Sequence, residues 1–194
     1  MKRMLLIVAI AMCSYANAQK GSVLVMGSID YNSQKTSYDA GDTTQNSFGF
    51  SPKVGYQFHE NWTAGIEASA GSYKYENYTS GVQKTTNFSV GGFVRYSKPL
   101  NETFSFYTDL GLGYLTRKET RNYPLAPDYE EKGNGMYVNV TPALFINVHK
   151  GFGLNFNIGG LGYNALSFDN NEREDKNFSF TLGRSFSIGI SKNF

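Results

Sequence analysis

Four charged residues stand in segments whose other odd-numbered positions are mostly Gly, Ser and Thr. They are Lys53, Glu67, Arg95 and Asp109, and their signs alternate along the chain. If folding brings them to one level, their ammonium, guanidinium and carboxylate groups can form buried ion pairs. Rings of charge can also select or gate ions. Ion pairing is therefore the first chemistry that the sequence indicates.

Catalytic and metal-binding patterns are weaker. His59 and His149 stand in predicted short turns with no obvious nucleophile beside them, so we expect solvated histidines. The run from Asp169 to Lys176 could offer carboxylates to Ca²⁺, but it lacks the spaced ligands and central Gly of an EF-hand. Arg and Lys are also interleaved in it. We therefore expect no enzymatic activity, no cofactor and no bound metal.

The elements that carry the four charges are strands. Between Phe178 and Phe194 the even positions are apolar except for two cations, and the odd positions are small or polar. This alternation is typical of a strand with two unlike faces. No stretch after the first 18 residues shows sustained helical periodicity. Eight such segments can be recognised, at residues 22–31, 48–58, 62–73, 86–97, 104–115, 136–148, 152–163 and 178–194.

The connections between these segments alternate in length. Three are short, whereas residues 32–47, 74–85, 116–135 and 164–177 are expected to be long polar loops. Short turns at one end and long loops at the other are typical of outer-membrane barrels. Segments of about 10–12 residues also suit a tilted strand that crosses a bilayer. The fold class predicted is all-β, an eight-stranded antiparallel up-and-down transmembrane β-barrel.

Aromatic residues collect at both ends of the apolar face, as membrane interfaces favour. The ring near the long loops contains Tyr31, Phe48, Phe88, Tyr114 and Phe178. The ring near the short turns, predicted to be a periplasmic aromatic girdle, contains Phe58, Trp62, Tyr96, Phe104, Phe152 and Phe194. A soluble secreted β-protein is the alternative, but its second face would carry many Lys, Glu and Gln.

The first 18 residues resemble a secretory signal peptide. Lys2 and Arg3 precede an apolar run, and Ala16-Asn17-Ala18 fits a cleavage site, so we expect residues 1–18 to be removed and residues 19–194 to form the barrel domain. The apolar run is too short for a membrane-spanning helix. Removal of residues 1–18 takes away the single cysteine and lowers the formal charge from +2 to zero. A neutral mature chain gives no reason to expect nucleic acid as a partner.

With these features the chain resembles the small outer-membrane β-barrels of Gram-negative bacteria, the OmpA/OmpX-like or porin-family barrels. Runs such as Gly92 to Tyr96 and Gly111 to Tyr114, together with the terminal Phe194, carry the resemblance. It implies an integral outer-membrane protein with both termini in the periplasm. The expected partners are outer-membrane lipid, lipopolysaccharide, the assembly machinery through the strand ending at Phe194, and an unknown extracellular ligand.

Turn positions predict how the four charges meet. They place Lys53 opposite Glu67, Glu67 opposite Arg95 through a loop centred near Gly81, and Arg95 opposite Asp109. We favour a structural ion network in the lumen over a gate, because eight strands leave room only for their own side chains. Removing Glu67 alone should then destabilise the barrel more than removing Glu67, Lys53 and Arg95 together.

The remaining lumen positions leave the molecular role open between three classes. Tyr107, Phe93, Phe145 and Leu161 are expected to point inward and to occlude the lumen. This favours a structural or surface-interaction role over a narrow passive pore or small-ligand conduit, which the many lumen glycines keep possible. A lipid-modifying enzyme is the distant alternative. Two prolines inside predicted strands, Pro52 and Pro142, indicate bulges or strand edges.

Overall fold

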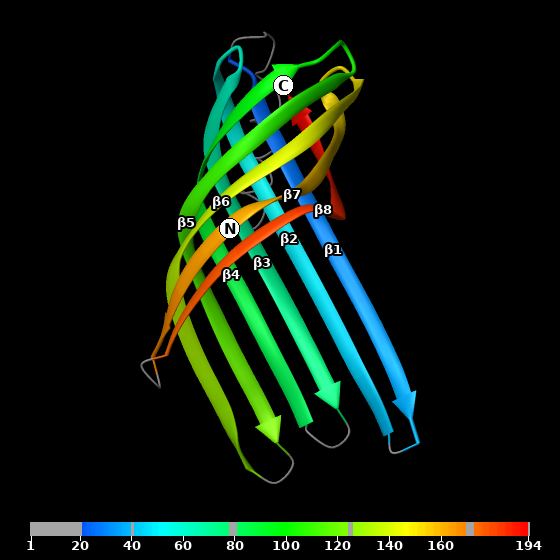
Figure 1. The fold of residues 1–194 in the computed structure, drawn as a ribbon, viewed down its shortest axis with the longest axis vertical. Helices are drawn as coiled ribbons and strands as arrows, with labels where there is room; N and C mark the ends of the chain where they lie inside the picture. Colours follow the sequence, from blue (N-terminus) through cyan, green and yellow to red (C-terminus); the bar gives the residue numbers. More distant parts are fainter. Residues whose placement is uncertain (1–20, 40, 78–80, 124–125, 170–172, 194) are drawn as a thin grey trace, which may run out of the picture.

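The chain folds into one closed antiparallel β-barrel in a computed structural model (Figure 1). The structure describes residues 21–39, 41–77, 81–123, 126–169 and 173–193, with the backbone alone at residues 126 and 184–188. Within these ranges no helix is long and apolar enough to cross a membrane. The predicted signal peptide and Phe194 lie outside them. The strands, which pair in chain order, are β1 (Val23–Tyr38), β2 (Gly41–His59), β3 (Trp62–Asn77), β4 (Gly81–Pro99), β5 (Phe104–Tyr123), β6 (Ala126–His149), β7 (Phe152–Phe168) and β8 (Glu174–Asn193).

The prediction of eight antiparallel strands is confirmed, but the prediction of four long loops is wrong. The strands continue through most of those segments and form extended hairpins, so that β1 ends at Tyr38 and β2 begins at Gly41. The hairpins β1–β2, β3–β4 and β5–β6 project at the lower end of Figure 1. The sequence hides these extensions because both of their faces are polar, which removes the alternation that marks a strand.

The strand register confirms two of the three predicted charge pairings. Lys53 lies opposite Glu67, and Arg95 lies opposite Asp109. The third is wrong, because Glu67 lies opposite Gly91 and Arg95 lies opposite Thr63. The β3–β4 hairpin is centred two residues earlier than predicted, since β3 runs on to Asn77 before β4 begins at Gly81. A shift by an even number of residues leaves every side chain on its predicted face.

The described ladders contain five register shifts, three beside turns and two within the barrel wall. Pro52 pairs with Gly27 of β1 without a shift in register, so the bulge or strand edge predicted there is wrong. Pro142 lies where the β6–β7 register shifts, between Val140 and Ala143, as predicted from its missing N–H donor. A second shift lies between Asn157 and Gly159 in the β7–β8 pairing, where Gly159 has a φ of 114°. The alternation of β7 reverses there. Leu161 therefore faces outward and is 42% exposed, so its predicted inward orientation is wrong.

The seam between β1 and β8 closes the barrel near the short turns. Its ladder runs from the pair Leu24 and Asn193 to the pair Gly27 and Ile190, which is four pairs among the described residues. The β1–β2 ladder runs along all of β1, from Val23 to Tyr38. The end of the barrel with the short turns is thus the fully closed end, and the four predicted charges lie close to it.

Candidate functional site

The central ion cluster contains the four charges predicted from the sequence. The Lys53 ammonium lies 2.7 Å from Glu67 Oε2 and 3.1 Å from Asp109 Oδ2. Arg95 binds the same Asp109 with two donors, Nε at 2.6 Å from Oδ1 and Nη2 at 2.9 Å from Oδ2. The Asp109 side chain is 1% exposed, so it has left water almost completely. A buried carboxylate of this kind requires its paired cations.

The cluster crosses the interior of the barrel. Lys53 is on β2 and Asp109 is on β5, and these strands are not neighbours in the sheet. A second crossing runs from β6 to β3, where the Tyr137 hydroxyl donates to Glu67 Oε1 at 2.8 Å. A third brings Arg95 Nη2 to 3.2 Å from Met26 Sδ on β1. Side chains from six strands are thereby tied together across the lumen.

Aromatic rings fill the space around these charges. Phe93 and Tyr107 face inward and are each 3% exposed, as predicted. The Arg95 guanidinium lies 3.7 Å from the centroid of the Tyr107 ring, and the Lys53 ammonium lies 5.2 Å from the centroid of Phe93. Such contacts stabilise a desolvated cation. The central cluster is therefore packed on its sides by rings as well as paired within itself.

Glycines make room for Tyr137, which crosses the lumen to Glu67. A side chain at Gly113 would bring its Cβ to 2.7 Å from Tyr137 Cε1, and a side chain at Gly91 would meet the Tyr137 hydroxyl and the Leu112 carbonyl. These positions were predicted as lumen glycines that leave free space. The space beside Gly91 and Gly113 is instead occupied by Tyr137, which adds to the closure of the lumen.

An outer ion cluster lies toward the β5–β6 and β7–β8 hairpins. Its centre is Arg173, whose Nη1 lies 3.0 Å from Glu131 Oε2 and whose Nη2 lies 3.3 Å from Glu119 Oε1 and 3.2 Å from Asp175 Oδ2. The guanidinium also lies 3.8 Å from the centroid of the Phe168 ring. Desolvation opposes its charge, but Asp175, Glu119 and Glu131 outweigh that effect and raise the pKa of Arg173.

The sequence does not predict the outer cluster, because its members fall in segments that are expected to be polar loops. Glu131 is fully buried and Glu119 is 8% exposed, which a solvated loop would not produce. One signal could have found them. Glu119 continues the odd-numbered, inward-facing set of Tyr107 and Asp109, so extending β5 by a few residues places it in the lumen.

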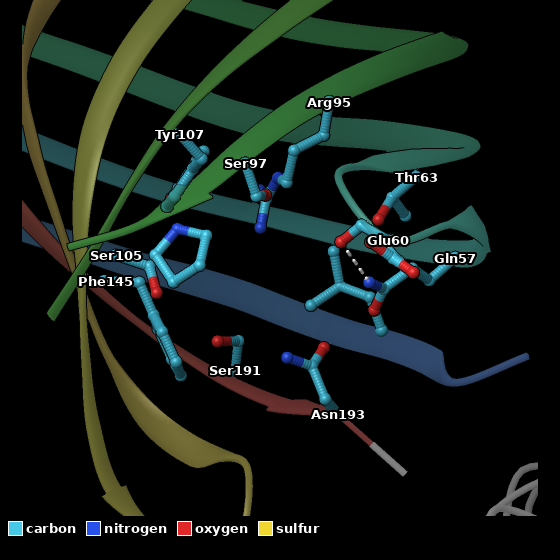
Figure 2. A pocket seen from close by; sticks show the side chains of 12 residues that line it. Gln57, Glu60, Thr63, Arg95, Ser97, Ser105, Tyr107, Phe145, Ser191 and Asn193 are labelled. Carbon is cyan, nitrogen blue, oxygen red and sulfur yellow. Dashed lines mark hydrogen bonds between the residues drawn. The ribbon is translucent and has the colours of Figure 1, made fainter. Parts of the chain in front are cut away.

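A cavity of about 220 Å³ lies between the central cluster and the short turns. Figure 2 shows hydroxyl and amide side chains around it, and Arg95 and Tyr107 are among the residues that line it. A water molecule takes roughly 30 Å³ of liquid volume, so the cavity has room for a few waters. Its polar residues include Gln57, Thr63, Ser97, Ser105, Ser191 and Asn193. It is a polar vestibule that ends at the central cluster.

The aromatic residues near the short turns project outward. Five of the six predicted girdle residues have exposed side chains, and the sixth, Phe194, lies outside the described residues. Trp62 and Tyr96 contact each other with ring centroids 5.0 Å apart. The exposed fractions are 56% for Phe58, 40% for Trp62, 41% for Tyr96, 37% for Phe104 and 41% for Phe152. That these rings form a periplasmic girdle remains a proposal.

The histidines are not brought together. His59 ends β2 and His149 ends β6, and both are exposed. Across the described ranges no group of three or more His, Cys, Asp and Glu side chains could hold a metal ion. In the central and outer clusters, by contrast, the fold brings acids and bases together as ion pairs.

Comparison with known proteins agrees with this architecture. The sequence profile of the outer membrane protein beta-barrel domain matches residues 4–186. The chain belongs to that family. It is therefore an integral outer-membrane β-barrel protein of the Gram-negative type. A search of curated protein sequences gave no match.

Several solved outer-membrane barrels are similar to the chain. Ail, the attachment invasion locus protein of Yersinia pestis, is 17% identical with a TM-score of 0.48, over 90% of this chain and 99% of Ail. Neisserial surface protein A is 13% identical with a TM-score of 0.43, over 91% of this chain and 98% of that protein. The N-terminal barrel domain of Pseudomonas aeruginosa OprF is 14% identical with a TM-score of 0.41, over 90% and 98% of the two chains.

Proposed function

We propose that this protein is a closed-lumen barrel that works through its outer surfaces. In this proposal both termini and the short turns face the periplasm, and the extended hairpins stand outside the cell, where they contact an extracellular ligand. The single observation that carries the proposal is the Lys53 ammonium bridging Glu67 and Asp109 across the lumen. A barrel closed in this way has only its lipid-facing surface and its hairpins to offer to partners.

Two features support a closed lumen over a pore. Eight strands enclose an interior just wide enough for side chains, whereas water-filled porins take about 16–18 strands. An ion on the barrel axis would also have to displace paired charges such as Asp109, which Arg95 and Lys53 hold from two sides. The pairing leaves no free charge in the central cluster to replace the hydration shell of a passing ion.

A narrow conduit is the second candidate, and one cavity favours it. The inner face of β6–β8 carries a cavity of about 240 Å³ whose lining includes Gly160, Gly162 and Thr181. Small side chains there leave space that bulkier ones would fill. Thr141 also lines this cavity and lies opposite Asp109 in the β5–β6 ladder, so a conduit would pass the central cluster and would require the Lys53 pairs to separate. No catalytic role is proposed, because His59 and His149 stand exposed at two different turns.

Cysteine labelling in intact cells tests the proposed orientation. The single cysteine, Cys13, lies in the predicted signal peptide, so the mature chain offers a background free of thiols. We expect Tyr38→Cys at the tip of the β1–β2 hairpin to react with a membrane-impermeant maleimide. Glu102→Cys in the β4–β5 turn should react only after the outer membrane is opened. Labelling of Glu102→Cys alone in intact cells would reverse the orientation.

A further inference from the structure

Lysines and arginines are sorted to opposite faces of the barrel in its hairpin half. Every lysine there projects outward, and every arginine whose side chain the structure describes projects inward. The inward arginines are Arg117, Arg121 and Arg173, which contact lumen residues such as Asn87, Glu119 and Glu131. The outward lysines, which we name the lysine collar, are Lys35, Lys74, Lys84, Lys118, Lys132 and Lys176.

Three lysines of the collar lie at the same distance along the strand from the outer aromatic ring, whereas Lys176 lies two residues from Phe178. Tyr31, Phe88 and Tyr114 are exposed outward-facing residues, and each is four residues from a collar lysine on its own strand. At about 3.3 Å per residue this is roughly 13 Å along the strand, and roughly 10 Å along the barrel axis for a strand tilt near 40°. Interfacial rings mark the edge of the hydrocarbon, so the collar stands at headgroup height.

Carboxylates accompany the lysines on the side away from the membrane. Lys35 pairs with Asp42 at 2.6 Å, Lys74 with Glu76 at 2.7 Å, and Lys176 with Glu174 at 2.7 Å. Glu130 serves both Lys118, at 2.9 Å, and Lys132, at 3.3 Å. In all of these pairs the acid stands two positions nearer the tip of the hairpin than its lysine. The lysine is thus always the charge that is nearer the lipid.

Two pairs of collar lysines lie directly opposite each other on neighbouring strands. Lys74 faces Lys84, and Lys118 faces Lys132. Like charges in this position destabilise a sheet unless an anion lies between them. Lys84 makes no ion pair with any described residue, and Lys118 and Lys132 share the one carboxylate of Glu130. Lys118 foremost, with Lys132, holds the pKa of Glu130 below its usual range.

The pair Lys118 and Lys132 stands over a groove on the outer face of β4–β6. The groove has a volume of about 370 Å³, with Phe88 and Tyr114 at its membrane side. Thr86 and Thr116 line its middle, and the two lysines line its far side. The rest of its lining comprises Arg117, Gly133, Asn134 and Asp169. Apolar, hydroxyl and cationic groups therefore follow one another in the order in which an acyl chain, a sugar or glycerol, and a phosphate follow in an anionic lipid.

We infer that this groove binds the phosphate-bearing headgroup of an outer-leaflet lipid, with an acyl chain along Phe88 and Tyr114 and the phosphate against Lys118 and Lys132 on the side away from Glu130. The inference rests on the proposed function in one respect, the placing of the hairpins outside the cell. Lysine suits the binding of a lipid phosphate, because its flexible side chain can bring a point charge to a mobile group. The planar guanidinium of arginine suits the fixed carboxylates of the lumen.

Titration of the purified, detergent-folded protein with lipid A tests the inference by native mass spectrometry. Bisphosphorylated lipid A should bind more tightly than dephosphorylated lipid A with the same acyl chains. Lys118→Gln combined with Lys132→Gln should lose about twenty-five-fold in affinity, from about fivefold per lysine. The matched control is Lys98→Gln with Lys150→Gln, which removes the same charge at the other end of the barrel and should stay within twofold.

Three results would overturn the inference. One is unchanged affinity for lipid A in the Lys118 and Lys132 double variant, and another is equal binding of the two forms of lipid A. The third is full displacement of lipid A by inorganic phosphate, which would make the site a simple anion site. Lys118→Arg with Lys132→Arg keeps both charges and should keep binding, and gel mobility before and after boiling reports whether each variant is folded. The closed lumen is tested separately by conductance, so that either proposal can fail without the other.

Discussion

Lys53 on β2 and Asp109 on β5 meet across the lumen with 3.1 Å between the ammonium and Oδ2, although β3 and β4 separate these two strands in the sheet. Lys53 also pairs with Glu67 on the neighbouring strand, and Arg95 holds Asp109 from β4. The result is a chain of charges rather than separate pairs. Asp109 is its key anion because two cations depend on it.

Asp109→Asn should destabilise the barrel more than Glu67→Gln. The first change leaves Arg95 without a carboxylate and Lys53 with Glu67 alone, and breaking a buried ion pair costs about 3–5 kcal/mol. The second leaves Lys53 paired with Asp109 and lets Tyr137 keep a hydrogen bond to the amide oxygen, so about 1–2 kcal/mol is expected. Urea unfolding of the folded barrel in lipid vesicles measures both. Equal urea midpoints for the two variants would show that Asp109 contributes no more to the stability of the barrel than Glu67 does.

The structure also reverses an expectation drawn from the predicted register. Removing Glu67, Lys53 and Arg95 together was expected to be milder than removing Glu67 alone. Because Arg95 pairs with Asp109 and not with Glu67, the triple change would leave Asp109, at 1% exposure, without either cation. The triple variant should therefore unfold at the lower urea concentration. A higher midpoint for the triple variant than for Glu67→Ala would support the register that the structure contradicts.

Gly91→Ala and Gly92→Ala separate the packed lumen from the lipid face at adjacent positions. A Cβ at Gly91 would meet Tyr137 and the Leu112 carbonyl, and overpacking of this kind costs about 1–3 kcal/mol. A Cβ at Gly92 meets only the Gly65 carbonyl at 3.6 Å, so its effect should stay within about 0.5 kcal/mol. Thermal unfolding in detergent compares them. A harmless Gly91→Ala would mean that the lumen beside Tyr137 is loosely packed.

Arg173→Met should loosen the β7–β8 hairpin without unfolding the barrel. The change leaves Glu131, which is fully buried, and Glu119 without their shared cation. Since the Arg173 side chain is 35% exposed, we expect a local cost of about 1–3 kcal/mol, below that of a fully buried pair. Hydrogen exchange in residues 164–177 should rise at least tenfold. Lys176→Met, which removes an exposed pair with Glu174, serves as the control and should leave that exchange unchanged.

The fold was predictable because membrane-crossing strands alternate between lipid and lumen, and the central cluster was predictable because its charges sit on the lumen side of that alternation. The predictions that proved wrong depended on where the strands end and where bulges interrupt them. Glu119 and Glu131 were assigned to a loop because polar hairpins show no contrast between faces, and that concealed the outer cluster. The predicted Glu67–Arg95 pairing is wrong because the β3–β4 hairpin is centred two residues earlier than predicted. The predicted inward orientation of Leu161 is wrong because no residue pattern indicates the bulge beside Gly159.

The fluorescence of Trp62 tests the placing of the aromatic girdle. It is the only tryptophan in the chain, it is 40% exposed, and it contacts Tyr96 at the short-turn end. Interfacial rings settle at headgroup depth. In vesicles of brominated lipids we expect the strongest quenching when bromine is near the headgroup and weak quenching when it is near the chain ends. The opposite order would place the short turns away from the interface.

Conductance in a planar bilayer tests the closed lumen most directly. The Lys53, Asp109 and Arg95 pairs close the lumen at the central cluster, and eight strands leave no water-filled channel around it. We expect the purified, folded protein to show little or no steady conductance. Stable, reproducible channels of large conductance that disappear when the protein is denatured would contradict the account and favour a pore.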